Sequence, residues 1–471
     1  MTTFGDIRRW SAVDLEETAN RLLNQSHTLL GLQDELDGST RTLLWTGEAA
    51  AAAGRAHDNM GDRLRRLVAQ VSAVRTALDE ASASVEALRR SVAEVDFFAA
   101  RYQFSVGDDA VVRDQLPPGE PLSDGDVEDR ARACTEIVDR IEQILRTAAD
   151  VDSDLAAVLN AAAEDTVADG VFPGLDNASR AGADAGHLTV GGPPAGGTPF
   201  DNAGYWNSLS GGQQADVLAQ HPDWVGNLDG IPATVRNQAN TSQLDGERAA
   251  LHAEAVRLQT ELDGAVFGSA FSNADAGLEL VRAKIASIDA ISTVMDRGSR
   301  QLLLLDLSGT RATAAIAYGN VDTADHVSVF TPGLNSTVDG NMASYDDQNR
   351  LLRVQAQEQS DRYGAGATVA TVTWIGYPAP QAEVPGFPGI LNPFEVRTQL
   401  GSVLDAATDD VARGGAERLS SFLDGIDASR SFDPHLTALG HSYGSLTTSL
   451  ALQNGTGVDD AVLFGLPRLG H

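Results

Sequence analysis

The sequence predicts a chain in two parts, a long all-α region followed by an α/β domain. As far as about Arg297 the apolar residues recur at helical spacing, and near the start leucines return every seven residues. From Gln301 onward the pattern changes to short apolar runs separated by turns and further helices. A length of 471 residues accommodates about two or three domains with a sizeable core.

Residues 1–104 are expected to form a helical hairpin. Two long helices are predicted between about Ala12 and Arg101. The first carries a seven-residue repeat at Leu15, Leu22, Leu29 and Leu36. The second has apolar residues at alternating steps of three and four, at Leu64, Leu67, Val71, Val74, Leu78, Ala81, Val85, Leu88, Val92 and Val95. This spacing is typical of a coiled-coil seam, and two such helices joined by a tight turn form an antiparallel hairpin.

Residues 105–300 are expected to contain further helices, in two segments divided by a linker. In the first segment, 105–180, a proline-bearing loop at 108–126 precedes a helix at about 126–165. The linker spans 181–204 and is rich in glycine, alanine and proline. In the last segment, 205–300, helices at about 210–220, 243–262 and 274–297 lead into the next domain.

Residues 301–471 are predicted to form the α/β domain. Strands are expected at 302–307, 312–318, 327–331, 367–374, 436–440 and 461–464. Helices are expected at 345–361, at 396–423 and after Ser442. The first three strands follow one another directly, and the later ones alternate with helices. This order predicts a sheet with an antiparallel start and a parallel remainder.

The most informative stretch is Gly440-His441-Ser442-Tyr443-Gly444, which matches G-x-S-x-G. An apolar run with strand character precedes it, and a helical run follows it. A serine on a sharp strand-to-helix turn is raised above the sheet edge, and flanking glycines let the backbone pass close to it. The alternative is a plain turn in which the serine only caps a helix. The strand–turn–helix context favours a catalytic nucleophile.

The order of the strands, with the motif after the fifth, resembles the α/β-hydrolase fold. Further blocks are similar to an actinobacterial α/β-hydrolase family, formerly a domain of unknown function, in which a helical N-terminal part precedes the hydrolase domain. These blocks are Trp206-Asn207-Ser208-Leu209-Ser210, His221-Pro222, the stretch from Gly226 to Arg236, Phe330-Thr331-Pro332-Gly333, Trp374-Ile375-Gly376-Tyr377 and the serine motif. The resemblance covers about residues 205–465. We expect the block at 227–236 to be structural and assign it no catalytic role.

Serine is a poor nucleophile at its ordinary pKa and needs a base and an oxyanion hole. Ser442 is expected to supply the attacking oxygen, and the N–H of Tyr443 one oxyanion donor. The second donor should come from the loop after the third strand, where Gly333 lets the backbone approach the substrate. Leu334, or alternatively Asn335, would present that N–H. The expected reaction is cleavage of an ester, thioester or amide of a small-molecule acyl substrate through an acyl-Ser442 intermediate.

The general base and its acid are not evident after the nucleophile. The α/β-hydrolase chain order is nucleophile, acid, histidine, yet the acidic residues that follow Ser442 are Asp459 and Asp460, and the only histidine is His471. The two aspartates open the sixth strand, at the wrong end of the sheet. Three earlier histidines are no better placed, because two begin their strands and one should point away from the site: His326, His435 and His441.

We therefore expect the α/β-hydrolase domain to be truncated after the sixth strand, where two more strands, an acid and a histidine would follow. A fragment, an early end of the reading frame and a catalytically incomplete relative are the three explanations left open. On this interpretation the 471-residue chain hydrolyses p-nitrophenyl esters weakly or not at all. The competing hypothesis is a non-catalytic, secretion-associated or partner-binding protein that uses the N-terminal hairpin.

The turn between the two long helices, Leu44-Trp45-Thr46-Gly47-Glu48, resembles the W-x-G turn of small helical-hairpin proteins exported by type VII secretion. The resemblance implies self-association or a helical protein partner, and export without a Sec signal peptide. The Tyr-x-x-x-Asp/Glu tail of that family has no counterpart at Tyr102, where the fourth residue on is Val106. A tryptophan that only plugs a helical core is the alternative.

The composition of the chain argues against some classes of binding partner. The formal net charge of −32 and a pI near 4.4 argue against nucleic acid or an anionic membrane surface, because binding phosphate needs a basic surface. No apolar run approaches the roughly 18 residues of a membrane helix. The N-terminus lacks the apolar core of a secretory signal, so we expect a cytoplasmic protein or type VII-like export. Cys134 is the only cysteine, no histidines pair at metal-ligand spacing, and we expect no cofactor or metal.

Overall fold

The structure is a computed structural model. It describes residues 2–40, 46–119, 121–167, 172–264, 273–381, 403–430 and 432–465. The chain divides into two compact units. The N-terminal unit comprises Met1–Pro194 and Gly204–Asp216, and the C-terminal unit comprises Ala195–Ala203 and Val217–His471. The two units are described separately below.

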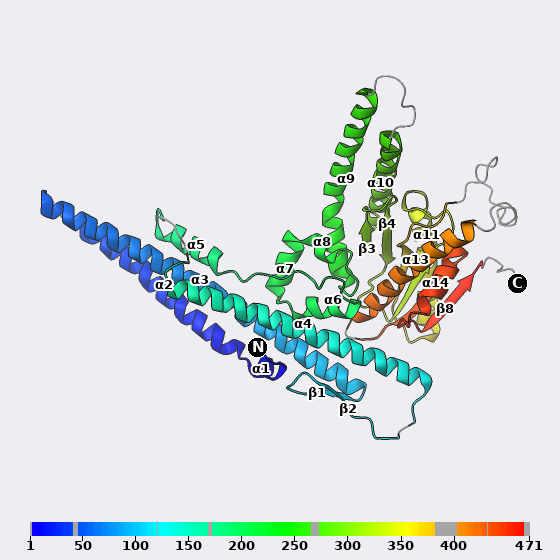
Figure 1. Ribbon diagram of the computed structural model, residues 1–471, viewed down its shortest axis with the longest axis horizontal. Helices are drawn as coiled ribbons and strands as arrows, with labels where there is room; N and C mark the ends of the chain where they lie inside the picture. The colour runs from blue at the N-terminus through cyan, green and yellow to red at the C-terminus, as the bar shows by residue number, and fades with distance from the viewer. Residues whose placement is uncertain are drawn as a thin grey trace. The chain divides into compact units, whose positions relative to one another are not determined.

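The N-terminal unit is built around one helix of 54 residues, α3. Figure 1 shows α2 alongside α3, and α4 and α5 also pack against it. The elements that begin in this part of the chain are α1 (Phe4–Arg9), α2 (Ala12–Thr40), α3 (Glu48–Arg101), β1 (Phe104–Val106), β2 (Val112–Asp114), α4 (Asp124–Ala163) and α5 (Leu175–Gly186). The two long helices predicted between Ala12 and Arg101 are confirmed. The tryptophan of the predicted W-x-G turn, Trp45, lies outside the described residues.

Small residues let the helices of this unit approach closely. A Cβ added at Gly182 of α5 would lie 2.0 Å from the carbonyl oxygen of Ala69 in α3. One added at Gly186 would lie 2.2 Å from the carbonyl oxygen of Ala73. Helix α3, whose apolar stripe was predicted to form a hairpin seam, therefore packs against several helices at once. The members of the predicted stripe from Leu78 to Val95 are buried, whereas Leu67 is 43% exposed. Ala69, Ala73 and Ala77, which lie outside the predicted stripe, are also buried.

The region between α3 and the next domain differs from the prediction in two places. The expected proline-bearing loop contains β2, which pairs with β1 in a two-stranded antiparallel sheet. The expected linker at 181–204 contains the end of α5, which runs to Gly186, and the start of α6 at Pro199. Glycines in α5 had suggested a flexible segment, whereas they serve its close contact with α3. The boundaries proposed for the domains stay a prediction.

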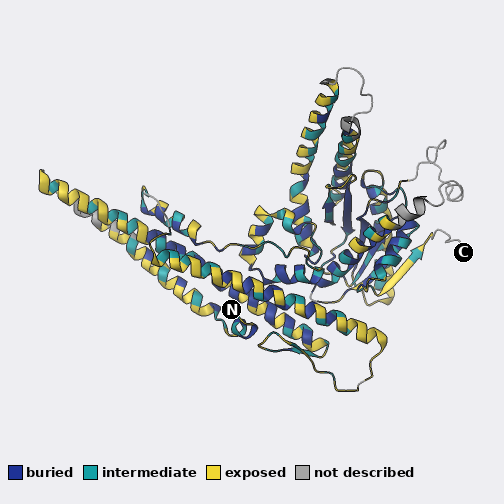
Figure 2. Ribbon diagram, viewed as in Figure 1, coloured by how far each residue is buried: buried dark blue, intermediate teal, exposed yellow. Residues whose placement is uncertain are grey.

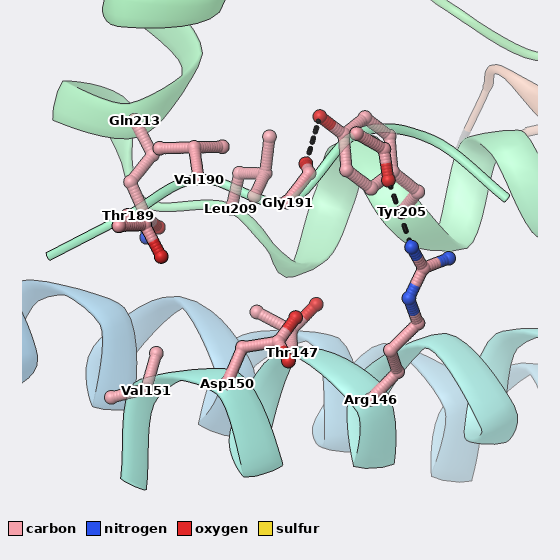
Figure 3. A pocket seen from close by; sticks show the side chains of 11 residues that line it. Arg146, Thr147, Asp150, Val151, Thr189, Val190, Gly191, Tyr205, Leu209 and Gln213 are labelled. Atoms are coloured by element: carbon pink, nitrogen blue, oxygen red, sulfur yellow. Dashed lines mark hydrogen bonds between the residues drawn. The ribbon is translucent and has the colours of Figure 1, made fainter. Parts of the chain in front are cut away.

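The N-terminal unit also encloses a cavity of about 10 Å³, roughly the space of one water molecule (Figure 3). On one side the Tyr205 hydroxyl donates to the carbonyl oxygen of Gly191 at 3.0 Å, and Arg146 donates to that of Gly192. Burial raises the pKa of Tyr205 to about 12, and the nearby Arg146 opposes this rise. The hydroxyl therefore stays protonated and remains a hydrogen-bond donor at neutral pH.

The remaining helices lead into a six-stranded sheet in the C-terminal unit. The helices are α6 (Pro199–Ser208) and α7 (Gly211–Gln220), which the unit boundary divides, then α8 (Pro222–Val225), α9 (Ala233–Gly264), α10 (Asn273–Met295), α11 (Val338–Tyr363), α13 (Val403–Ala428) and α14 (Tyr443–Leu452). The strands are β3 (Arg300–Asp306), β4 (Thr313–Tyr318), β5 (His326–Thr331), β6 (Val369–Ile375), β7 (His435–His441) and β8 (Asp460–Phe464). All six predicted strands are present, and each lies within a few residues of its expected position.

The strand order of the sheet is β3-β4-β6-β5-β7-β8. The pairs β3–β4 and β4–β6 are antiparallel, and β6–β5, β5–β7 and β7–β8 are parallel. The predicted antiparallel start and parallel remainder are therefore confirmed. In a sheet of this kind ligands bind beyond the carboxyl ends of the parallel strands, so the ends of β5, β6 and β7 are the place to look for a site.

Helices cover both faces of the sheet, as alternating side chains show. Leu302 of β3 belongs to an apolar cluster with α9, α10 and α11, whereas its neighbour Leu303 belongs to a second cluster with α13 and α14. In β6, Ile375 belongs to the first of these clusters and its neighbour Trp374 to the second. The exception is β8, an edge strand whose residues are mostly exposed (Figure 2). Within the described residues, no helix is long and apolar enough to cross a membrane.

Candidate active site

Ser442 lies on the turn between β7 and α14, with φ 54° and ψ −122°. A positive φ is uncommon for a residue other than glycine, and such strain concentrates at functional sites. Neighbours hold the turn in place. The Ser442 N–H donates to the carbonyl oxygen of Phe464 at 2.9 Å, and the Ser445 N–H donates to that of Ser442 at 3.0 Å. The predicted strand–turn–helix geometry is confirmed, and the simple helix cap fails because the Ser442 side chain makes no capping hydrogen bond.

Both glycines of the motif are required by close packing. A Cβ added at Gly440 would lie 2.8 Å from the Cα of Ser445, inside the first turn of α14. One added at Gly444 would lie 2.2 Å from the carbonyl oxygen of Thr331 and 2.6 Å from that of Pro332. These separations are too short for a side chain, so a larger residue at either position would move α14 away from the strand ends.

The loop after β5 lies directly against this turn. Thr331 and Gly440 are register partners in the parallel pair β5–β7, so both chains leave the sheet side by side. A Cβ added at Gly333 would lie 2.8 Å from the Ser442 Cβ and 3.1 Å from the Tyr443 nitrogen. The backbone at Gly333 therefore packs directly against Ser442 and Tyr443, while its predicted approach to a substrate stays a prediction.

The two candidate N–H groups of this loop differ. Asn335 has φ 61°, and its N–H donates to the carbonyl oxygen of Pro380 at 3.0 Å. That donor is already engaged. Among the described residues, no acceptor takes a hydrogen bond from the Leu334 N–H. The two N–H groups therefore differ in whether a described acceptor already engages them, and the assignment of the second oxyanion donor stays a prediction.

Tyr377, which ends one of the sequence blocks noted above, lies beside this loop, and sequence reasoning gave it no role in positioning the loop. Its hydroxyl donates to the carbonyl oxygen of Pro332 at 2.8 Å, and its ring stacks on those of Tyr443 and Trp374. Burial raises the pKa of Tyr377, and the Thr447 hydroxyl beside it opposes the rise. The signal that could have found it is position, since this aromatic residue comes just after a buried strand, at the carboxyl edge of the sheet.

Histidines and acids gather at the opposite end of the same strands. His435, the first residue of β7, lies 3.0 Å from a carboxylate oxygen of Asp460 and 3.7 Å from one of Asp459. Its ring meets that of His326, the first residue of β5, with centroids 5.3 Å apart. The expectation that these groups lie away from the nucleophile is confirmed.

The histidine next to the nucleophile is turned toward the edge strand. The ring of His441 packs on Phe464 of β8, with centroids 5.2 Å apart. His471 lies outside the described residues. Within the described part of the chain, no group of three or more histidine, cysteine or acidic side chains could hold a metal ion.

A cavity of about 390 Å³ lies elsewhere in the C-terminal unit, beyond the ends of β3 and β6. Its lining includes Leu304, Asp306, Trp374, Arg418 and Phe422. Ser442 and the loop after β5 do not line it. A cleft at the nucleophile itself, bounded by residues 332–335, stays a prediction.

Comparison with known proteins agrees with this architecture. Residues 308–471 match a family model described as Alpha/beta hydrolase. This region has the α/β-hydrolase fold. An uncharacterized protein of Mycobacterium tuberculosis is 29% identical over 290 residues, which cover 58% of this chain and 40% of that protein. An uncharacterized protein of Mycobacterium bovis is 34% identical over 190 residues, 39% of this chain and 64% of that protein.

The chain thus spans 40% and 64% of the lengths of these two relatives. No solved structure matches it. The match to the Mycobacterium tuberculosis protein is longer than the region covered by the family model, so the likeness extends into residues before 308. That agrees with the sequence blocks noted from Trp206 onward.

Proposed function

We propose that this protein is a serine hydrolase that cleaves an ester, thioester or amide through an acyl-Ser442 intermediate. The observation that carries the proposal is the left-handed backbone of Ser442, held at the end of β7 with the Gly333 backbone packed against it. A serine cap without a catalytic role needs neither the strained φ nor the close approach of a second loop.

The described residues account for the attack and for stabilising the charge that develops. The Ser442 Oγ attacks the acyl carbon, and the carbonyl oxygen becomes an oxyanion. The N–H groups of Tyr443 and Leu334 donate to that oxygen. Leu334 is preferred to Asn335, because the Asn335 N–H is already bonded to Pro380. The oxyanion collapses and expels the alcohol, thiol or amine, and water then releases the acid from the serine.

Proton transfer needs a further group. The Ser442 proton must pass to a base, which returns it to the leaving group. Within the described part of the chain, His326 and His435 lie at the other end of the strands and His441 packs on Phe464. None of these three histidines is therefore placed to act as the base.

The proposal is tested by trapping the acyl-enzyme. The protein is incubated with p-nitrophenyl acetate and quenched in acid, and its peptides are mapped by mass spectrometry. We expect acetyl on the peptide that carries Ser442, and none there in Ser442→Ala. Ser449→Ala, on the same helix, serves as the matched control and should acylate normally. Acetyl spread over surface residues and unchanged by Ser442→Ala would contradict the proposal.

We also propose a protein partner for the N-terminal hairpin, either a second copy or another helical protein. Its two helices expose apolar side chains, with Leu32 47%, Met60 56% and Leu67 43% exposed. Size-exclusion chromatography with light scattering tests self-association. We expect the double substitution Met60→Glu and Leu67→Glu to shift any dimer toward monomer. If the parent protein is monomeric, cross-linking then tests whether the hairpin binds a different helical protein.

A further inference from the structure

We propose that Tyr377 is a positioning residue that sets the separation of the two oxyanion donors, the N–H groups of Tyr443 and Leu334. This inference rests on the proposed serine-hydrolase function. Tyr377 follows β6, whereas the two donors follow β7 and β5. One side chain therefore touches both of the segments whose spacing defines the oxyanion hole.

The hydroxyl of Tyr377 controls the loop after β5. It donates to the carbonyl oxygen of Pro332 at 2.8 Å. That carbonyl belongs to the peptide unit joining Pro332 to Gly333, and the next unit carries the Leu334 N–H. A peptide unit is planar, so fixing one leaves only the two torsions at Gly333 to orient the next. Glycine restricts these torsions least, so an external anchor matters most at this position.

The ring of Tyr377 contacts the other donor's residue. It stacks on Tyr443, with centroids 6.2 Å apart and planes 20° apart. On its other side it stacks on Trp374, with centroids 5.9 Å apart and the same interplanar angle. A Cβ added at Gly415 of α13 would lie 3.2 Å from the Tyr377 ring. Tyr377 is 1% exposed, so these neighbours leave the ring little freedom to move.

The same segment holds the loop at a second point. The carbonyl oxygen of Pro380, three residues after Tyr377, accepts the N–H of Asn335 at 3.0 Å. The two hydrogen bonds bracket Gly333 and Leu334, one on each side. The Leu334 N–H has no acceptor among the described residues. The two hydrogen bonds on either side of it therefore hold this N–H in a position where it can donate to a substrate oxygen.

Burial keeps Tyr377 in the form that this role needs. Desolvation raises the pKa of its hydroxyl, which stays protonated through neutral and moderately alkaline pH. A protonated phenol donates to Pro332, whereas a phenolate could not. The anchor is therefore expected to persist over the pH range in which a serine hydrolase acts.

The test compares Tyr377→Phe with a matched control, Tyr205→Phe. Tyr205 is also a buried tyrosine whose hydroxyl donates to a backbone carbonyl, at 3.0 Å, but it lies in the N-terminal unit. Labelling by a fluorophosphonate is followed at several probe concentrations. We expect Tyr377→Phe to lower the maximal labelling rate about tenfold, less than the loss of a whole oxyanion donor, with little change in the probe concentration for half-maximal rate. Tyr205→Phe should label like the parent protein.

Hydrogen exchange provides a readout that does not depend on activity. In Tyr377→Phe the amide of Asn335, which is bonded to Pro380, should exchange about tenfold faster, while those of β5 stay protected. Absence of labelling in the parent protein would count against the serine-hydrolase proposal. The hydrogen-exchange result would then decide whether Tyr377 positions the loop. Unchanged exchange at Asn335, or an equal fall in labelling for both variants, would overturn the role of Tyr377.

Discussion

The two ends of β5 and β7 differ sharply in their chemistry. At the amino ends stand His326 and His435, with Asp459 and Asp460 beside them. At the carboxyl ends stand a strained serine, glycines and backbone N–H groups. The side chains that most often perform acid–base chemistry thus cluster at the end of the strands opposite Ser442.

This contrast teaches that residue type alone is a poor guide to the site. The amino-end cluster is largely exposed, and carboxylates there accept hydrogen bonds from backbone N–H groups at strand ends: Asp459 from Leu436 at 2.7 Å, and Asp325 from Thr368 at 2.7 Å. At the carboxyl end the contacts are between backbones, and they are so close that only glycine fits. Position relative to the sheet, rather than the presence of a histidine, separates the two regions.

The largest effect should come from filling the space beside the nucleophile. Gly333→Ala places a Cβ 2.8 Å from both the Ser442 Cβ and the His441 carbonyl oxygen. The loop must move away, and the Leu334 N–H moves with it. We expect fluorophosphonate labelling to slow by about 100-fold, comparable to the loss of an oxyanion donor.

The control for this substitution is Gly414→Ala in α13. An added Cβ there meets nothing within 4 Å, and alanine favours a helix. We expect its labelling rate to equal that of the parent protein and its melting temperature to hold or rise slightly. Equal labelling by Gly333→Ala and the parent would mean that this loop takes no part in the site.

A smaller effect, on stability alone, is expected at the amino end. Hydrogen bonds from the Thr368 backbone and hydroxyl hold the pKa of Asp325 below its ordinary value of 3.8. The ionised carboxylate therefore stabilises the fold above pH 3.8, and this contribution is lost as the pH falls below that value. We expect Asp325→Asn to lower the melting temperature by about 2 °C at neutral pH.

Thermal denaturation at neutral pH and at about pH 3 checks this prediction. The difference in melting temperature between Asp325→Asn and the parent protein should narrow as the pH falls. The rate of fluorophosphonate labelling at neutral pH should not change. A gap that widens in acid would contradict the direction of the shift.

The smallest effect is expected for His435→Gln. This change removes the contacts of the His435 ring with Asp459 and Asp460 at a side chain that is 44% exposed, and exposed polar contacts of this kind contribute little to stability. Labelling should stay within about twofold of the parent protein, because the residue lies a strand's length from Ser442. A large fall in labelling would place the amino end in the chemistry and break the contrast between the two ends.

Much of the C-terminal fold follows from local sequence patterns. Buried strands such as β6 are short runs rich in apolar residues, and the G-x-S-x-G motif stands between a strand and a helix, so both could be predicted. The small sheet of β1 and β2 could not, because strands of three residues carry no detectable period. The end of α5 was also missed, since its glycines match a linker until α3 is placed against them.

The residues of the candidate site also differ in whether the sequence could predict them. Ser442 and the glycines around it could be predicted because a local turn imposes its own residue requirements. The choice between Leu334 and Asn335 could not, because it depends on a hydrogen bond to Pro380, which lies on a different loop. The contact of Tyr377 with Pro332 joins residues 45 positions apart, and single-sequence patterns do not report such pairs.

The central claim is that Ser442, in its strained turn, is an activated nucleophile. The most direct measurement is covalent labelling of the protein by a fluorophosphonate, with the modified peptide identified by mass spectrometry. The account predicts one modified residue, Ser442, and no labelling of Ser442→Ala, while Ser449→Ala labels as the parent does. Labelling at another serine, or a parent protein that reacts no faster than Ser442→Ala, would contradict it.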